Sequence, residues 1–272
     1  MTKRRLRLVL FTLPCAIVEY IQHWEQGLFD TQGGNPKQTI YFYGGSRLRQ
    51  QGIIIRHVNG ILSRMDVNAL LEKAHHLMKI GRYDDAIVHY DRVLELDSRN
   101  ITALENKGQA YYYLGRHESA LACYEKAIAI NPKLISLWYE KGYTLRKVHR
   151  YEEAVESFDR ALVIDPEYTF ALSNKGYALN ELGNYTEAIA CFDKILALSP
   201  NNIRAATAKA IALRELGKNE EALVYFDRAL NFNSINSFVY YNKAIALRNL
   251  GRIKEADDCL KIVNFPRGAG KK

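Results

Sequence analysis

The sequence predicts an all-α solenoid built from six helix-turn-helix repeats, and three sets of residues with a 34-residue spacing predict it. The first set is glycine with one histidine: Gly81, Gly115, His149, Gly183, Gly217 and Gly251. The second set is alanine throughout: Ala86, Ala120, Ala154, Ala188, Ala222 and Ala256. The third set is an aromatic ring, with leucine in the last repeat: Tyr90, Tyr124, Phe158, Phe192, Phe226 and Leu260. A fixed period of this length is typical of solenoids, in which each unit buries its apolar face against its neighbours.

Each repeat contains two helices, and the segment 101–134 illustrates both. Apolar and small residues at helical spacing predict a first helix over 101–114 and a second over 118–130. Gly115 ends the first helix, and Pro132 prevents the second from continuing. Small residues of the first helix face the alanine set and let the two helices cross closely: Ala74, Gly108, Gly142, Gly176, Ala210 and Ala244.

These residues and their spacing resemble the tetratricopeptide repeat (TPR) family, a family of helix-turn-helix units. The resemblance covers six copies, which we number one to six: 67–100, 101–134, 135–168, 169–202, 203–236 and 237–270. It implies a right-handed superhelical solenoid over 65–272 whose concave face binds another protein. The outer copies drift from the family pattern, since Ser98, Ser234 and Gly268 stand where the inner copies have proline.

Residues 1–64 lack the repeat period and are predicted to form a poorly ordered or small, irregular extension. The apolar run 8–18 follows a basic start, as in a signal peptide, but no A-x-A-like cleavage site follows it. The run is also too short to span a membrane, which takes about 20 residues. Two β-branched and aromatic runs, 38–43 and 52–58, suggest a short hairpin.

Three interpretations of this extension stay open. It is a genuine tail or hairpin, a targeting segment, or an over-extended gene model whose natural start is Met65. The third interpretation rests on Asp66, which is a good N-cap for the first helix of copy one.

The formal net charge of +8 suggests an anionic partner such as nucleic acid, so the location of the charge matters. Residues 1–64 contain nine Lys or Arg against Glu19, Glu25 and Asp30, and therefore carry six of the net charges. The six copies are nearly neutral. An RNA-binding helical repeat that uses its basic charge is the alternative function, and this distribution opposes it.

One lysine recurs in every copy: Lys73, Lys107, Lys141, Lys175, Lys209 and Lys243. A row of ammonium groups could bind phosphates. However, the helical wheel places this position beside the buried stripe and away from the concave face. We expect the lysine stems to cover apolar surface and their ammonium groups to stay in water.

The sequence gives no indication of catalysis. Its seven histidines form no H-E-x-x-H pattern and no cysteine pair has metal-ligand spacing, so we predict no metal, no cofactor and no enzyme activity. Cys123, Cys191 and Cys259 recur two copies apart, which places them about 20 Å from one another if stacked helices are about 10 Å thick. A disulfide needs Cα atoms within about 7 Å, so these cysteines are predicted to be small buried hydrophobes.

The candidate site is the face of each first helix that turns away from the second helix, which in the TPR family lines the concave groove. Aromatic rings and arginines gather there, and they suit peptide binding because rings offer flat apolar area and arginine pairs with carboxylates. The predicted groove residues are Tyr112, Tyr139, Tyr143, Arg146, Phe170, Tyr177, Arg214, Tyr241 and Arg248.

Similar proteins that hold chaperone C-termini use a carboxylate clamp of lysines, asparagines and arginine. Asn106, Asn174 and Asn242 match one element of that clamp, but no copy has the lysine at its fifth position. We therefore do not expect a dedicated chaperone clamp.

The combined prediction is a cytoplasmic, non-catalytic scaffold or adaptor that binds a peptide or partner helix, with an acidic or aromatic segment as the suggested ligand. Nucleic acid and membranes are not expected partners. Copy six ends in an apolar helix with no capping helix after it, so we also predict a homodimer through the C-terminal repeat.

Overall fold

The computed structural model describes residues 29–30, 41–42, 66–232 and 236–264. Contacts between residues divide the chain into two units, Met1–Met65 and Asp66–Lys272. In the first unit, β1 (Phe29–Asp30) pairs antiparallel with β2 (Tyr41–Phe42). The run 38–43 thus contributes a strand, but its partner is β1, whereas the predicted partner 52–58 lies outside the described residues, as does the apolar run 8–18.

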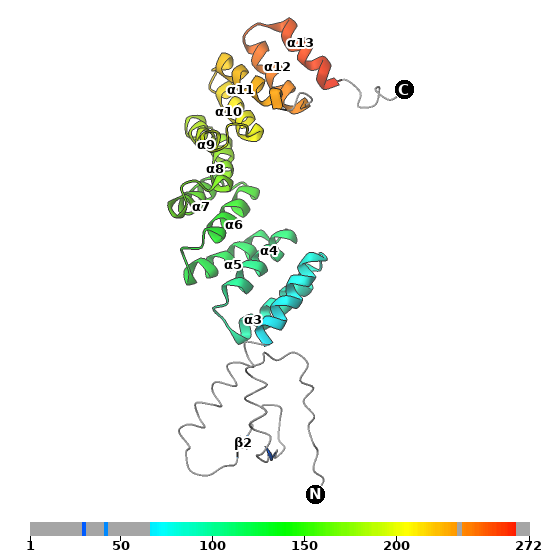
Figure 1. Ribbon diagram of the computed structural model, residues 1–272, viewed down its shortest axis with the longest axis vertical. Helices are drawn as coiled ribbons and strands as arrows, with labels where there is room; N and C mark the ends of the chain where they lie inside the picture. Colours follow the sequence, from blue (N-terminus) through cyan, green and yellow to red (C-terminus); the bar gives the residue numbers. More distant parts are fainter. Residues whose placement is uncertain (1–28, 31–40, 43–65, 233–235, 265–272) are drawn as a thin grey trace, which may run out of the picture. The chain divides into compact units, whose positions relative to one another are not determined.

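The described part of the second unit is entirely helical, which confirms the predicted all-α solenoid (Figure 1). Copy one contributes a helix over 66–79 and the helix α3 (Tyr83–Leu96). The other copies contribute the pairs α4 (Ile101–Tyr113) and α5 (His117–Ile130), α6 (Ile135–Lys147) and α7 (Tyr151–Ile164), α8 (Thr169–Glu181) and α9 (Tyr185–Leu198), α10 (Ile203–Glu215) and α11 (Asn219–Phe232), and α12 (Ser237–Asn249) and α13 (Ile253–Asn264).

The turn between the two helices of a copy requires a left-handed backbone. The glycines of the repeating set have φ angles between 73° and 78°. His149 takes the same conformation with a φ of 63° and is the one non-glycine residue with a positive φ in the described part of the chain. Its Nδ1 lies 2.6 Å from the Tyr151 hydroxyl. Residues with a Cβ enter this region at a cost of about 1 kcal/mol, so copy three is locally strained at this turn.

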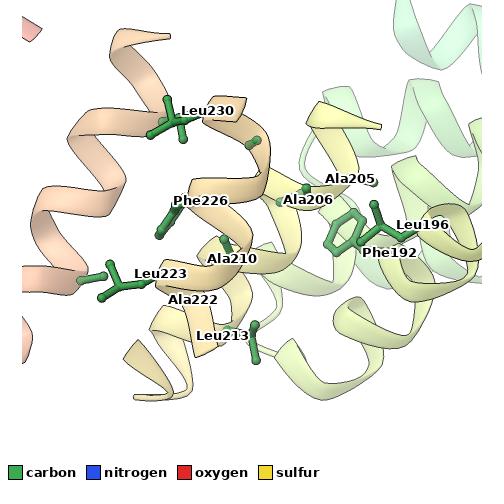
Figure 2. Packing of buried hydrophobic residues seen from close by; sticks show 14 of the residues in the cluster. Phe192, Leu196, Ala205, Ala206, Ala210, Leu213, Ala222, Leu223, Phe226 and Leu230 are labelled. Atoms are coloured by element: carbon green, nitrogen blue, oxygen red, sulfur yellow. The ribbon is translucent and has the colours of Figure 1, made fainter. Parts of the chain in front are cut away.

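The core of each copy forms where a large side chain of the second helix meets a small residue of the first. A Cβ added to Gly142 would lie 2.8 Å from the ring of Phe158, and one added to Gly108 would lie 2.5 Å from the ring of Tyr124. Both rings are fully buried. Figure 2 shows the same principle in copies four and five, where α10 contributes small side chains between Phe192 and Phe226.

The recurring lysines join neighbouring copies, which the sequence did not predict. In copies two to six the ammonium group pairs with a carboxylate on the second helix of the preceding copy: Lys107 with Asp91 at 2.5 Å, Lys141 with Glu125 at 2.9 Å, Lys175 with Asp159 at 2.5 Å, Lys209 with Asp193 at 2.5 Å, and Lys243 with Asp227. These lysine side chains are only 10% to 21% exposed. The stems are covered as expected, but the ammonium groups bind carboxylates instead of remaining in water. They are not a row of free charges.

A second set of ion pairs also crosses the junctions between copies. It joins an arginine at the start of one copy's second helix to a carboxylate of the preceding copy: Arg116 to Asp84 at 2.9 Å, Arg150 to Glu118 at 3.2 Å, and Arg252 to Glu220 at 3.6 Å. Each junction of this kind therefore has acidic groups on the earlier copy and basic groups on the later one.

The outer face of α13 reverses this arrangement. Lys261 occupies the position at which the five earlier copies carry the paired acidic residue, and Lys254 occupies a position at which Glu220 and Glu118 are acidic. Asp257 stands where the earlier copies have an apolar residue: Ile87, Leu121, Val155, Ile189 and Leu223. Lys254, Asp257 and Lys261 are all exposed. At Lys254 and Lys261 this face of copy six is basic where the earlier copy of an internal junction is acidic.

The predicted apolar patch on copy six is present in part, because Ile253 and Ile262 of α13 are exposed. Val239 and Leu247 of α12 are buried inside the array, and Leu260 of α13 is half-buried. Asp257 instead pairs with Arg248 at 3.3 Å. Charged residues interrupt the exposed apolar side chains of α13, and the homodimer through copy six stays a prediction.

Gly142→Ala should destabilise the array although alanine favours helices. The added Cβ would overlap the Phe158 ring, and overpacking of this kind costs about 1–3 kcal/mol. The combination of Gly142→Ala with Phe158→Leu should lose less stability than the sum of the two single changes, because the smaller side chain makes room. Urea unfolding followed by circular dichroism measures these differences. A neutral Gly142→Ala would contradict the assigned contact.

Asp257→Leu combined with Lys261→Asp should cause concentration-dependent self-association in sedimentation velocity. The two changes give α13 the apolar and the acidic residue that α11 has at the same repeat positions, Leu223 and Asp227, on its side facing α12. Asp258→Leu is the matched control, because its position in the repeat is exposed in all five earlier copies. A double variant that sediments like the unmodified chain would show that these residues do not determine whether this face accepts another helix.

Candidate functional site

The first helices of the copies lie closer together than the second helices do. α4 contacts α6, α6 contacts α8, α8 contacts α10 and α10 contacts α12. No comparable contact joins the second helices of successive copies in the described part of the array. The array therefore curves toward its first helices, and the sides of these helices that face away from the second helices line the concave surface, which we call the groove.

Four of the predicted groove residues form a continuous aromatic row across α4, α6 and α8. The ring centroids of Tyr112 and Tyr143 are 5.7 Å apart, those of Tyr143 and Tyr139 are 6.0 Å apart, and those of Tyr139 and Phe170 are 6.1 Å apart. Phe170 is 62% exposed, so it offers a large apolar side chain to solvent at one end of the row. Burial and contact with Tyr143 raise the pKa of Tyr112 to about 12, so its hydroxyl is neutral at physiological pH.

Arg146 lies beside this aromatic row. Its guanidinium carbon is 5.4 Å from the centre of the Tyr143 ring, a distance suited to a cation–π interaction. Among the described residues, no carboxylate lies within 4.0 Å of it. Its buried Nε has no hydrogen-bond partner in the described part of the chain, and neither has the buried Oδ1 of Asn180, one copy further on. Arg146 therefore keeps hydrogen-bonding capacity for an anionic group.

The remaining predicted groove residues do not join this row. Tyr177 packs on Phe192, with a centroid distance of 5.7 Å, and is half-buried. Arg214 donates to Asn242 Oδ1 at 2.7 Å and pairs with Glu215. Arg248 pairs with Asp257, and Tyr241 is 52% exposed on α12, apart from the row. The structure thus brings together Tyr112, Tyr139, Tyr143, Arg146 and Phe170, and separates the other four residues from them.

The asparagines that resembled a clamp element are used within their own helices. Asn106 donates to the Thr102 carbonyl at 2.8 Å, Asn174 to the Phe170 carbonyl at 2.9 Å, and Asn242 to the Phe238 carbonyl at 2.8 Å. In each of these asparagines, one amide hydrogen is therefore used inside the helix. This geometry gives no support to a carboxylate clamp, in agreement with the missing lysines.

Sequence reasoning overlooked a pair of carboxylates at the groove. Glu105 on α4 and Glu140 on α6 are both half-buried, and Gln109 Nε2 donates to Glu140 Oε1 at 3.5 Å. Burial, followed by the nearby Glu105 charge, raises the pKa of Glu140. Glutamate at these helix positions looks in the sequence like any solvent-exposed helical glutamate. Only the approach of α4 to α6 reveals that the two groups are near one another.

Burial also explains the inert character of the cysteines. Cys123, Cys191 and Cys259 are buried and free, as predicted, and burial raises the pKa of each thiol. No group of three or more His, Cys, Asp or Glu side chains in the described residues is arranged to hold a metal ion. Among the helices of the described segments, none is both long enough and apolar enough to cross a membrane.

Comparison with known sequences places the tetratricopeptide repeat over most of the array. Profiles of this repeat match residues 66–133, 135–168, 168–234 and 239–261. No curated protein matches the chain significantly.

Solved structures with a similar fold are tetratricopeptide and related helical proteins. A tetratricopeptide repeat protein from Parabacteroides merdae is 22% identical with a TM-score of 0.66, over 73% of this chain and 79% of that one. PilW, described as a type IV pilus biogenesis factor, is 23% identical with a TM-score of 0.62, over 75% and 95% of the two chains. YrrB, described as a TPR protein with an unusual peptide-binding site, is 24% identical with a TM-score of 0.59, over 64% and 90%. At these identities the likeness concerns the fold.

Glu140→Gln should raise the melting temperature of the protein at pH 7 by about 1–3 °C. The folded state holds the pKa of this carboxyl above its unfolded value, so ionisation of Glu140 opposes folding at neutral pH. The increase in melting temperature should become smaller as the pH falls through the raised pKa of Glu140. It should disappear at a pH where this carboxyl is protonated in both the folded and the unfolded state. Thermal unfolding at several pH values provides the measurement. Glu125→Gln, which breaks an ion pair with Lys141, is the control and should not raise the melting temperature.

Proposed function

Because this chain belongs to the tetratricopeptide repeat family, we propose that it is a non-catalytic scaffold or adaptor that binds a segment of another protein along the groove of copies two to four. The observation that carries the proposal is the aromatic row of Tyr112, Tyr143, Tyr139 and Phe170 with Arg146 beside it. Tyrosine and arginine are enriched among the residues that contribute most to binding energy in protein interfaces.

The chemistry of these residues suggests the kind of segment that would bind. Aromatic rings provide rigid apolar contact at a small cost in side-chain entropy. Arg146 has no carboxylate partner among the described residues, so an acidic side chain or a terminal carboxylate of the partner could form a bidentate pair with it. YrrB, which shares the fold, is described as having a peptide-binding site. A peptide with an acidic and an aromatic or apolar residue fits this part of the groove.

The alternative of RNA binding finds little support in the array. Five of the six recurring lysines are paired with carboxylates, and most of the net positive charge belongs to residues 1–64. A homodimer through copy six stays a prediction, because α13 exposes both charged and apolar side chains. A cytoplasmic location stays a prediction.

Tyr143→Ala combined with Arg146→Ala should weaken binding of a partner by about 2 kcal/mol or more, which is roughly 30-fold in Kd. The partner is first identified by affinity capture and mass spectrometry, and its affinity is then measured by calorimetry with purified proteins. Tyr241→Ala combined with Arg248→Ala is the matched control, because it removes the same residue types outside the aromatic row. Equal losses in both variants, or no loss in the first, would contradict the assigned groove. Circular dichroism verifies that both variants keep their helicity.

A further inference from the structure

The groove contains an uncompensated negative site next to its aromatic row. Four acidic residues in the described segments are half-buried, whereas the others are exposed: Asp91, Glu105, Glu140 and Asp159. Asp91 and Asp159 each bind a lysine at 2.5 Å. No lysine, arginine or histidine nitrogen of the described residues lies within 4.0 Å of Glu105 or Glu140. The protein thus compensates its half-buried carboxylates wherever they join two copies and leaves them uncompensated only in the groove.

An unpartnered hydroxyl lies at the same place. Tyr124 is fully buried, and its ring packs on Gly108 of α4. Its hydroxyl has no hydrogen-bond partner among the described residues. Burial is the largest cause that raises the pKa of this hydroxyl, and the charges of Glu140 and Glu105 raise it further. Tyr90 has an equally unpartnered hydroxyl in copy one, but no pair of carboxylates accompanies it.

Aromatic side chains complete the surroundings of Glu140. Tyr139 precedes it on α6, and the rings of Tyr139 and Tyr168 are 5.7 Å apart. Burial and then the Glu140 charge raise the pKa of both tyrosines. A carboxylate pair beside aromatic faces is well suited to an organic cation, because the ion pair and the cation–π interaction act together when water is excluded.

We propose that Glu105 and Glu140 receive a basic side chain, lysine or arginine, from the segment that binds in the groove. This inference rests on the proposed function. It requires a basic residue in the partner segment in addition to the acidic residue that would pair with Arg146 on the same helix. Glu140 and Arg146 are six residues apart on α6, which is about 9 Å along the helix axis. The partner segment therefore carries both signs of charge.

A random peptide library displayed on phage and selected on the full-length chain tests this proposal without knowledge of the natural partner. Peptides selected by the unmodified chain should be enriched in lysine or arginine at one position. Selection on a Glu105→Gln, Glu140→Gln double variant should lose this basic preference and keep the aromatic and acidic ones. Glu152→Gln with Glu156→Gln is the matched control, because these glutamates of α7 are exposed. It should leave the basic preference intact.

Synthetic versions of an enriched peptide provide the quantitative measurement. Replacement of the basic residue by norleucine should weaken binding to the unmodified chain about tenfold and have little effect on binding to the double variant, as a double-mutant cycle requires for two groups in contact. The double variant should be folded and no less stable than the unmodified chain, so loss of structure cannot mimic this result.

Different results would contradict the receptor for a basic side chain and the binding function of the groove. Enriched peptides without a basic preference, or an equal effect of norleucine on both proteins, would overturn the receptor for a basic side chain and leave the proposed groove intact. If no peptide were enriched on the unmodified chain, the proposed binding function itself would be contradicted, together with this inference.

Discussion

The whole array depends on the close approach of a large side chain of each second helix to a small residue of each first helix. The Phe158 ring leaves no space for a Cβ at Gly142, and the Tyr124 ring leaves none at Gly108. This contact sets how near the two helices of a copy lie, and hence which faces remain for stacking and for the groove. The ion pairs between copies can form at regular positions only because every copy has the same internal geometry.

The period of the sequence was sufficient to predict the helix pairs, because the residues that define them act inside one copy. His149 illustrates this: it stands in the glycine set and adopts the left-handed turn that the set requires. The ion pairs of Lys107 and its counterparts were not predictable in the same way, since each joins two copies and depends on their relative rotation. The periodicity of a single helix gives no information about that rotation.

For the candidate site, too, the sequence predicted the features of single helices but not the contacts between copies. The face of the first helices could be identified from helical geometry, and five of its residues do come together. Tyr177 is on that face as well, yet its ring packs on the ring of Phe192 from the second helix of the same copy. Glu140 has a raised pKa because of burial and of the nearby Glu105 charge, and Glu105 lies on a different copy. Contacts between two copies depend on how the copies are placed relative to one another, which the sequence does not show. The residues that share one face of a helix can be inferred from the sequence.

The reversed charges of α13 also restrict how such an array can lengthen during evolution. Duplication of an internal copy would reproduce an existing junction, in which an acidic residue such as Asp193 meets a lysine such as Lys209. Duplication of copy six behind itself would instead oppose Lys261 to a second Lys243 and place Asp257 in an apolar interface. A junction formed by a duplicate of copy six behind copy six would therefore lack the ion pair and the apolar contact that the internal junctions have.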